Sequence, residues 1–195
     1  MSNSAQARRA KQTANNLLYS MLATAAVVVV MVIITPRPTQ SLLQPVKYEQ
    51  VAKMAAKSTG KPVLAPPLLG KGWYSNSASW NTKTSDGVDN WYLGFVGPQD
   101  QYVALTQAYG TNPTWSVFQL KGDMPAGARK IGGRTFTVWK STTTNSPRLS
   151  HDYALVTDIT TATGTDQVIV FGTAHYATLT RFAALVAHNL NLLYP

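Results

Sequence analysis

Ser150, His151 and Asp152 stand side by side and have the residue types of a hydrolytic triad. In a working triad the histidine takes a proton from the serine while the acid orients the imidazole. Neighbours along a strand point to opposite faces, so these three residues are better interpreted as a turn that leads into a strand. The chain also contains no Gly-x-Ser-x-Gly elbow, the common signature of serine hydrolases. We therefore expect no catalytic residues and no enzyme activity.

Metal-ligating residues show no local pattern either. His151, His175 and His188 are too far apart for a His-Glu-x-x-His motif. The segment Asp86-Gly87-Val88-Asp89 has a faint likeness to a calcium loop, but the next acids follow too late, which favours a turn. The absence of cysteine excludes thiolate metal sites and thiol redox chemistry. We expect no metal and no cofactor. A catalytic pair of carboxylates of the glycosidase type, contributed by separate strands, remains an alternative.

The net charge of +9 raises the question of an anionic partner. Arg8, Arg9 and Lys11 lie together near the N-terminus, and the other basic residues are spread singly along the chain. Neither Gly70-Lys71-Gly72 nor Gly132-Gly133-Arg134 has the spacing of a phosphate-binding loop. We expect no nucleic acid partner. A mildly basic face turned toward anionic lipid headgroups or phosphate-bearing wall polymers is the favoured hypothesis.

Residues 17–34 form an apolar stretch, LLYSMLATAAVVVVMVII, without a charge or a proline. As a helix these residues cover about 27 Å, close to the roughly 30 Å hydrocarbon thickness of a bilayer. Helices in a soluble core are usually amphipathic, whereas this stretch is apolar all round, so we predict a transmembrane helix. Basic residues precede this stretch, and the positive-inside rule therefore predicts that residues 1–16 form a short cytoplasmic tail.

A cleaved signal peptide is the alternative to an uncleaved signal-anchor. Its apolar region is normally about 7–15 residues long and ends at a small-x-small site. Residues 33–38 offer no such site, although a cut near residues 39–41 stays open. Pro36 and Pro38 stop the helix, and residues 35–45 are predicted to be a linker. We expect a single-pass protein of the cell membrane, bound to the lipid bilayer by this helix, with residues 46–195 as an extracytoplasmic domain.

The predicted domain is α+β. Residues 46–57 have helix-forming composition and end before Gly60 and Pro62. The final segment has apolar residues at helical spacing, among them Leu179, Phe182, Val186 and Leu190. Between the two helices we expect about seven short strands in meander order, forming a mostly antiparallel sheet against which the helices pack. The predicted strands are 73–80, 91–96, 102–107, 129–131, 135–139, 153–157 and 168–171.

The order of short motifs resembles an uncharacterised actinobacterial family, the domain-of-unknown-function 4245 family. The resemblance begins with the basic tail, the single apolar stretch and Thr-Pro-Arg-Pro at residues 35–38. It continues through Trp-Tyr-Leu-Gly-Phe-Val-Gly-Pro at 91–98, Gln-Tyr-Val-Ala-Leu-Thr-Gln at 101–107 and Ile-Gly-Gly-Arg-Thr-Phe at 131–136. It implies a membrane-anchored envelope protein and brings no catalytic residues. The element order is also similar to small envelope domains of the Mog1/PsbP type, a likeness of fold alone.

Aromatic residues are the remaining candidates for a functional surface. The chain has five tryptophans and nine tyrosines, and most should belong to the core. Asn112-Pro113-Thr114 predicts that Trp115 lies in a loop, so Trp115 and Tyr109 are the candidate interaction residues. We expect a non-catalytic interaction module or accessory subunit whose partner is a membrane or envelope protein. A binder of a lipid, glycan or peptide is the alternative, and an uncharacterised envelope enzyme is less favoured.

Overall fold

The computed structural model describes residues 3–34, 45–82, 84–120, 123–141 and 152–195. The chain divides into two compact units, Met1–Leu42 and Leu43–Pro195. In the first unit, α1 (Asn3–Ile34) contains the predicted span of residues 17–34. It also includes most of the predicted tail, because the Ala, Gln, Arg and Lys residues there are good helix formers. In the part of the chain that the structure describes, no helix is long and apolar enough to cross a membrane.

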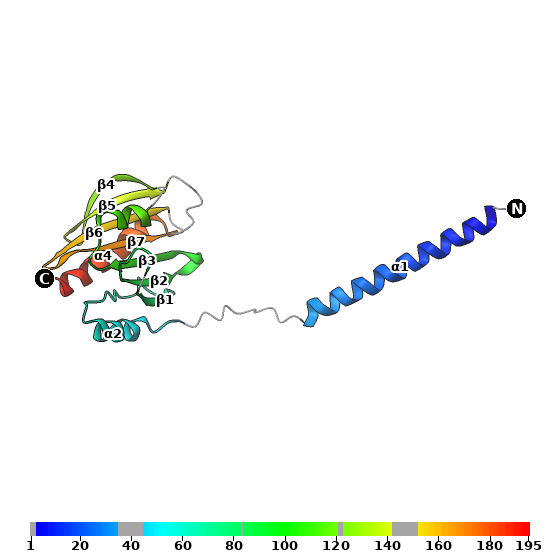
Figure 1. The fold of residues 1–195 in the computed structure, drawn as a ribbon, viewed down its shortest axis with the longest axis horizontal. Coiled ribbons are helices and arrows are strands. Elements are labelled where there is room, and N and C mark those ends of the chain that lie inside the picture. Colours follow the sequence, from blue (N-terminus) through cyan, green and yellow to red (C-terminus); the bar gives the residue numbers. More distant parts are fainter. Residues whose placement is uncertain (1–2, 35–44, 83, 121–122, 142–151) are drawn as a thin grey trace. The chain divides into compact units, whose positions relative to one another are not determined.

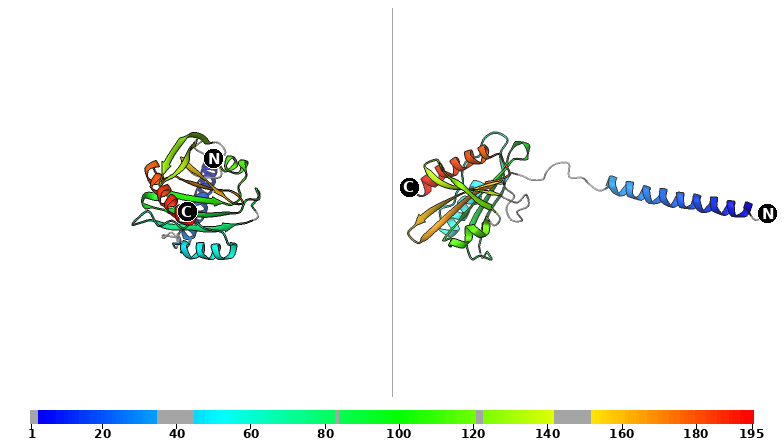
Figure 2. Two further views of the ribbon diagram at one scale, coloured as in Figure 1. Left: turned by 90° about the vertical axis from the view of Figure 1, so that its left-hand side faces the viewer. Right: turned by 90° about the horizontal axis from the view of Figure 1, so that it is seen from above.

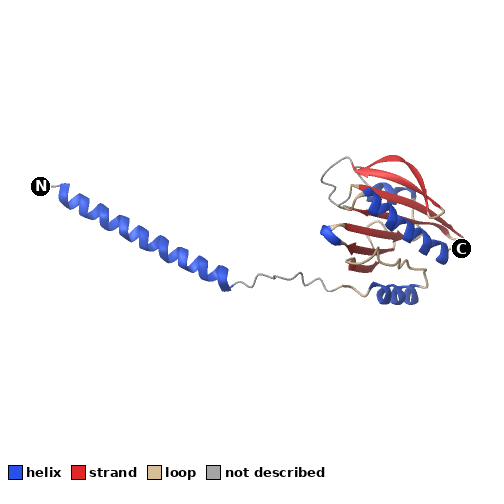
Figure 3. Cartoon of the chain, turned by 180° about the vertical axis from the view of Figure 1, so that it is seen from behind, coloured by secondary structure: helices blue, strands red, loops and turns tan. Residues whose placement is uncertain are grey.

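The second unit is an α+β domain built on one antiparallel sheet of seven strands, as the sequence predicts (Figure 3). The spatial order is β1-β2-β3-β7-β6-β5-β4. The predicted simple meander is therefore wrong at one junction, because β3 pairs with β7 and β4 lies at the edge. The strands are β1 (Tyr74–Asn81), β2 (Asn90–Val96), β3 (Tyr102–Ala108), β4 (Asp123–Ile131), β5 (Arg134–Ser141), β6 (Tyr153–Thr161) and β7 (Gly164–Gly172).

Alternation along the central strands separates two apolar faces. Leu93, Leu105, Val170, Leu155 and Val138 pair in one row across five neighbouring strands. All five are buried in the larger core cluster. Their neighbours in sequence point the other way into a smaller cluster, since successive strand residues face opposite sides. The sheet thus carries a core on each face.

Helices cover these faces unequally. α2 (Tyr48–Thr59) and α4 (Tyr176–Leu193) contribute to the larger cluster and so lie on the same face. α3 (Pro113–Gln119) packs on the opposite face, as Figure 2 shows for α4 in red and α3 in green. The two long helices confirm the prediction of helices at both ends of the domain. The apolar stripe of α4 buries Leu179, Phe182, Val186 and Leu190.

Turn residues explain the element boundaries. Gly60 ends α2 with a left-handed φ of 68°, and its amide donates to the carbonyl oxygen of Ala56. Gly132 and Gly133 join β4 to β5 with φ of 58° and 87°, as a two-residue hairpin requires. β6 and β7 run further than predicted, because the threonine-rich residues near the turn continue the ladder as far as Thr161 and Gly164.

Candidate functional site

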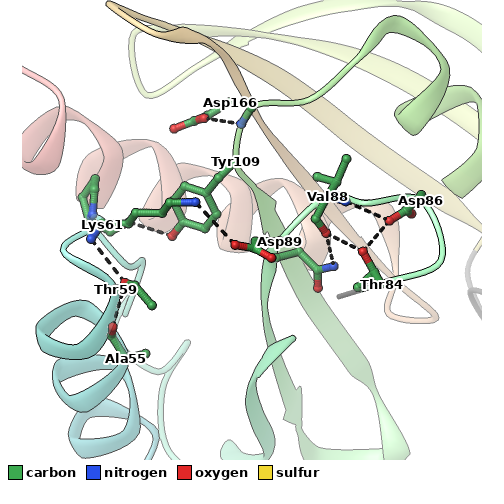
Figure 4. A network of polar contacts seen from close by, with 12 residues as sticks. Ala55, Thr59, Lys61, Thr84, Asp86, Val88, Asp89, Tyr109 and Asp166 are labelled. Atoms are coloured by element: carbon green, nitrogen blue, oxygen red, sulfur yellow. Dashed lines mark hydrogen bonds and ion pairs between the residues drawn. The ribbon is translucent and has the colours of Figure 1, made fainter. Parts of the chain in front are cut away.

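Three chain segments meet at one end of the sheet and form what we call the turn end (Figure 4). They are the β1–β2 loop, the loop that follows β3, and the β6–β7 turn. The amide of Gly110 donates to Asp166 Oδ1 at 2.8 Å, and the amide of Thr111 donates to the carbonyl oxygen of Thr165 at 2.8 Å. These bonds fix the loop after β3 against the start of β7. Two recesses open at this end.

The first recess, which we call the Lys61 recess, has a volume of about 320 Å³. The ammonium of Lys61 lies 3.6 Å from Asp89 Oδ2 and 5.0 Å from the ring centre of Tyr109. The Tyr109 hydroxyl in turn donates to the carbonyl oxygen of Pro62 at 2.7 Å. The ion pair is partly exposed and contributes little to stability. The recess is lined by Gly60, Lys61, Pro62, Tyr109, Gly110, Thr161, Thr163, Asp166 and Tyr194.

A buried polar network lies beneath this recess. The Gln107 side chain accepts from the amide of Leu64 at 2.9 Å and donates to the carbonyl oxygen of Pro62 at 3.0 Å. It also donates to the Tyr194 hydroxyl at 3.2 Å, and that hydroxyl donates to Asp166 Oδ2 at 3.3 Å. The network joins the segment after α2, strand β3 and the end of α4. Its polar groups are paired within the chain, which is the state that a stable buried network requires.

Both phenols of the site favour their neutral forms. Burial raises the pKa of Tyr109 above its ordinary value of 10, and the nearby Tyr194 and Asp166 raise it further. Burial, and then the charge of Asp166, raise the pKa of Tyr194 to about 12. At neutral pH both hydroxyls therefore act as hydrogen-bond donors and not as bases.

The second recess, which we call the α3 recess, has a volume of about 400 Å³. It is lined by Ser85, Asp86, Asn112, Thr114, Trp115 and Phe118. Asn112 caps α3, because its side chain accepts from the amide of Thr114 at 3.1 Å. Asp86 Oδ1 accepts from the Thr84 hydroxyl at 2.5 Å and from the amide of Val88 at 3.2 Å. Residues 84–88 thus form a turn, which is the local structure that the sequence predicts.

The family model described as a protein of unknown function, DUF4245, matches residues 9–186. The chain belongs to the DUF4245 family. No curated protein and no solved structure matches it. Membership of DUF4245 confirms the family that the motif order indicated, and the likeness to Mog1/PsbP-type domains stays a prediction.

In this DUF4245 chain, the side chains of both candidate interaction residues are buried, and their part in binding stays a prediction. Trp115 is only 1% exposed and Tyr109 only 6%. Trp115 lies in α3 and not in a loop, because the Asn112 cap and Pro113 at the first position start a short helix. Its ring packs in the smaller core cluster. Both rings nevertheless border a recess, Trp115 the α3 recess and Tyr109 the Lys61 recess.

The residues that sequence reasoning weighed for catalysis do not assemble within the described residues. Ser150 and His151 lie outside them. Asp152 is exposed, and its backbone pairs with Gly172 and Ser141 just before β6 begins at Tyr153. His175 is exposed at the start of α4, and His188 is exposed further along that helix. Among the described residues, no three metal-ligating side chains come together.

Several residues of the turn end carried no signal in the sequence. Gln107 is fully buried although nothing in its strand pattern marks a polar core position. Asp166 is 8% exposed, and its partners come from residues 110 and 194, far away along the chain. The exposed apolar side chains of Val117, at 62%, and Phe118, at 41%, on α3 also escaped notice. We call these two residues the α3 surface.

Proposed function

We propose that this chain is a single-pass membrane protein whose folded unit is a non-catalytic interaction module for a membrane or envelope protein. The observation that carries the proposal is the exposure of α1. Its large apolar side chains from Leu17 to Met31 are between 52% and 67% exposed. A helix that is apolar all round needs an apolar environment, and a bilayer supplies one. The structure describes the side chains of α1 as far as Met31. The last three residues of the proposed anchor, 32–34, therefore lie beyond the described side chains.

The α3 surface supports the interaction part of the proposal. Val117 and Phe118 place two exposed apolar side chains next to each other along α3. Large exposed apolar residues that lie together are typical of protein-binding sites, where aromatic residues are enriched.

A second candidate function is supported by the Lys61 recess. Thr161 and Thr163 border it together with the partly exposed Lys61. Hydroxyl and ammonium groups around a small recess suit a hydroxyl-rich ligand such as a glycan better than a lipid chain. In that case alanine at Lys61 would abolish binding of a wall glycan, whereas substitutions on the α3 surface would not change it.

Topology is the first test of the proposal. The chain has no cysteine, so a single cysteine can be placed at Ser4 or at the exposed Ser85 and labelled with a membrane-impermeant reagent in intact cells. We expect labelling of the Ser85→Cys variant alone. Labelling of the Ser4→Cys variant alone would reverse the orientation, and labelling of both would exclude the anchor.

Position-specific crosslinking in cells tests the interaction. A photoreactive residue at Phe118 of the full chain should crosslink one envelope protein, and the same residue at Ala162, exposed in the β6–β7 turn, should not. A protease site introduced into residues 35–44 would release the folded unit, and we expect the crosslink to weaken because tethering raises the effective concentration. A crosslink of equal yield at both positions, or one unaffected by release, would contradict the proposal. Loss of cellular function on changing Asp152 or His175 to alanine, with an unchanged melt, would favour an enzyme.

A further inference from the structure

The outward face of α2 is basic and partly apolar. α2 buries Tyr48, Ala52 and Ala55 against the sheet, where it lies beside β1 (Figure 1). Lys53 and Lys57 are exposed on its other side. Met54, which is 66% exposed, lies beside them, and Lys47 precedes the helix. We call Lys47, Lys53, Met54 and Lys57 the α2 face.

Interactions within the helix explain only part of this arrangement. Lys57 lies in the last turn of α2 and complements the helix dipole, and Glu49 in the first turn stands four residues before Lys53. Lys53 and Lys57 are themselves four residues apart, so their like charges are neighbours on the helix surface, which is unfavourable. Neither Lys53 nor Lys57 forms a salt bridge with another residue that the structure describes. Neither helical effect explains an exposed methionine among lysines.

The covalent chain keeps the α2 face close to the proposed anchor. Residues 35–47 separate the end of α1 at Ile34 from the start of α2 at Tyr48. Fully extended, this connection spans at most about 50 Å, whatever path it takes. A helix tethered at that distance from a bilayer meets lipid headgroups more often than a free helix in solution does.

We propose that the α2 face lies on the bilayer and binds the phosphate headgroups of anionic phospholipids, an inference that rests on the proposed membrane anchor. The lysine ammonium groups pair with phosphate oxygens, and Met54 reaches the boundary between headgroups and acyl chains. The apolar face of α2 packs against the sheet, so the contact with lipid rests on the lysine charges and on Met54. Each lysine near an anionic surface strengthens binding about fivefold.

Docking of α2 would also orient the folded unit. α2 and α3 belong to core clusters on opposite faces of the sheet. With α2 on the headgroups, the α3 surface stays uncovered by lipid and accessible to a protein partner. The same contact thus holds the module at the membrane and presents its other face.

The test uses the full chain reconstituted into vesicles of phosphatidylcholine, alone or mixed with phosphatidylglycerol. An environment-sensitive fluorophore is attached to a Met54→Cys variant, and a Val117→Cys variant carries the same label as a control on α3. Nitroxide-bearing lipids should quench the label at position 54 in the anionic vesicles and leave the label at position 117 bright. The change Lys53→Gln with Lys57→Gln should lower the ratio of docked to undocked chains about 25-fold, because two lysine contributions are lost. Arg129→Gln with Lys130→Gln, at two exposed residues of β4, is the matched control and should have no effect.

The other possible outcomes distinguish a failure of the proposed membrane anchor from a failure of the proposed lipid contact. A chain that does not float with the vesicles overturns the proposed anchor and, with it, this inference. A chain that floats while the label at position 54 is quenched no more than the label at 117 overturns the inference alone. Quenching that is equal in neutral and anionic vesicles also overturns it, because headgroup charge is then not recognised. Release of the docked helix by a soluble phosphate-bearing wall polymer, with no dependence on lipid charge, would assign the α2 face to that polymer instead.

Discussion

The indole N–H of Trp91 donates to the backbone carbonyl oxygen of Leu64 at 2.9 Å, deep in the larger core cluster. This bond attaches the proline-rich segment after α2 to strand β2. Trp115 is equally buried in the smaller cluster, but its Nε1 has no hydrogen-bond partner among the described residues. The two tryptophans therefore have the same exposure and different polar surroundings.

The first prediction compares phenylalanine at these two positions. Each change removes similar packing, but only Trp91→Phe leaves the carbonyl of Leu64 buried without its donor. We expect Trp91→Phe to lower the free energy of unfolding by about 1–3 kcal/mol more than Trp115→Phe. Chemical denaturation of the two variants measures the difference. Equal losses would mean that the Trp91 bond contributes nothing to stability.

The strands were accessible to sequence reasoning because their signals are local. Trp91 to Val96 and Tyr102 to Gln107 alternate or run apolar between strong turn residues, and the structure places β2 and β3 there. The order of strands in the sheet was not accessible in the same way. Pairing of β3 with β7 brings together residues such as Leu105 and Val170, and no short-range pattern in the sequence records that contact.

The candidate site was largely hidden for the same reason. Its polar pairs, such as Asp166 with Gly110 and Gln107 with Tyr194, join residues far apart along the chain. Trp115 was misplaced because a proline suggested a loop, whereas proline also favours the first position of a helix. A cap residue directly before that proline, Asn112, was the local signal that could have found α3.

The second prediction concerns the β4–β5 turn. A Cβ at Gly132 would lie 2.7 Å from Cβ of Ala187 on α4, whereas a Cβ at Gly87 would meet nothing within 4 Å. Both glycines have positive φ, at 58° and 73°, so alanine costs about 1–2 kcal/mol of backbone strain at each. Gly132→Ala should cost a further 1–3 kcal/mol or so, because the turn must move away from α4. Thermal melts of both variants test this prediction. An equal loss of stability in the two variants would show that the turn can move away from α4 without a measurable cost.

The third prediction is a loss of stability in alkali. The folded-state pKa of Tyr194, at about 12, lies above the value of 10 for an unfolded tyrosine. Between these pH values the folded state binds more protons than the unfolded state, so the free energy of unfolding falls as pH rises. Below pH 10 this contribution is fully present, and it is lost as pH passes through about 12. The burial of Tyr48, whose pKa is also raised to about 12, adds a slope of the same sign.

Tyr194→Phe isolates the contribution of one phenol. This variant should be less stable than the parent at neutral pH, because Gln107 and Asp166 lose a partner. Its free energy of unfolding should also fall less steeply between pH 10 and 12. Urea titrations at a series of pH values give both quantities. An unchanged slope in Tyr194→Phe would place the alkaline sensitivity in other tyrosines.

The last prediction separates the α3 surface from the buried ring beside it. Val117 is 62% exposed, so lysine at this position should change the free energy of unfolding by less than about 1 kcal/mol. A partner that covers this side chain would have to desolvate an ammonium group, which costs affinity. We expect the crosslink from position 118 to fall at least about tenfold, equivalent to roughly 1.4 kcal/mol of binding energy.

Lysine at Ala162, exposed in the β6–β7 turn, is the matched control and should leave the crosslink unchanged. Trp115→Phe should also preserve the crosslink, because the ring is 1% exposed and contributes to packing under α3, not to its outer surface. If the Val117→Lys variant keeps the full crosslink, the partner does not use the α3 surface. If Trp115→Phe abolishes the crosslink while the melt is unchanged, the partner instead reaches the α3 recess, and recognition depends on that buried indole.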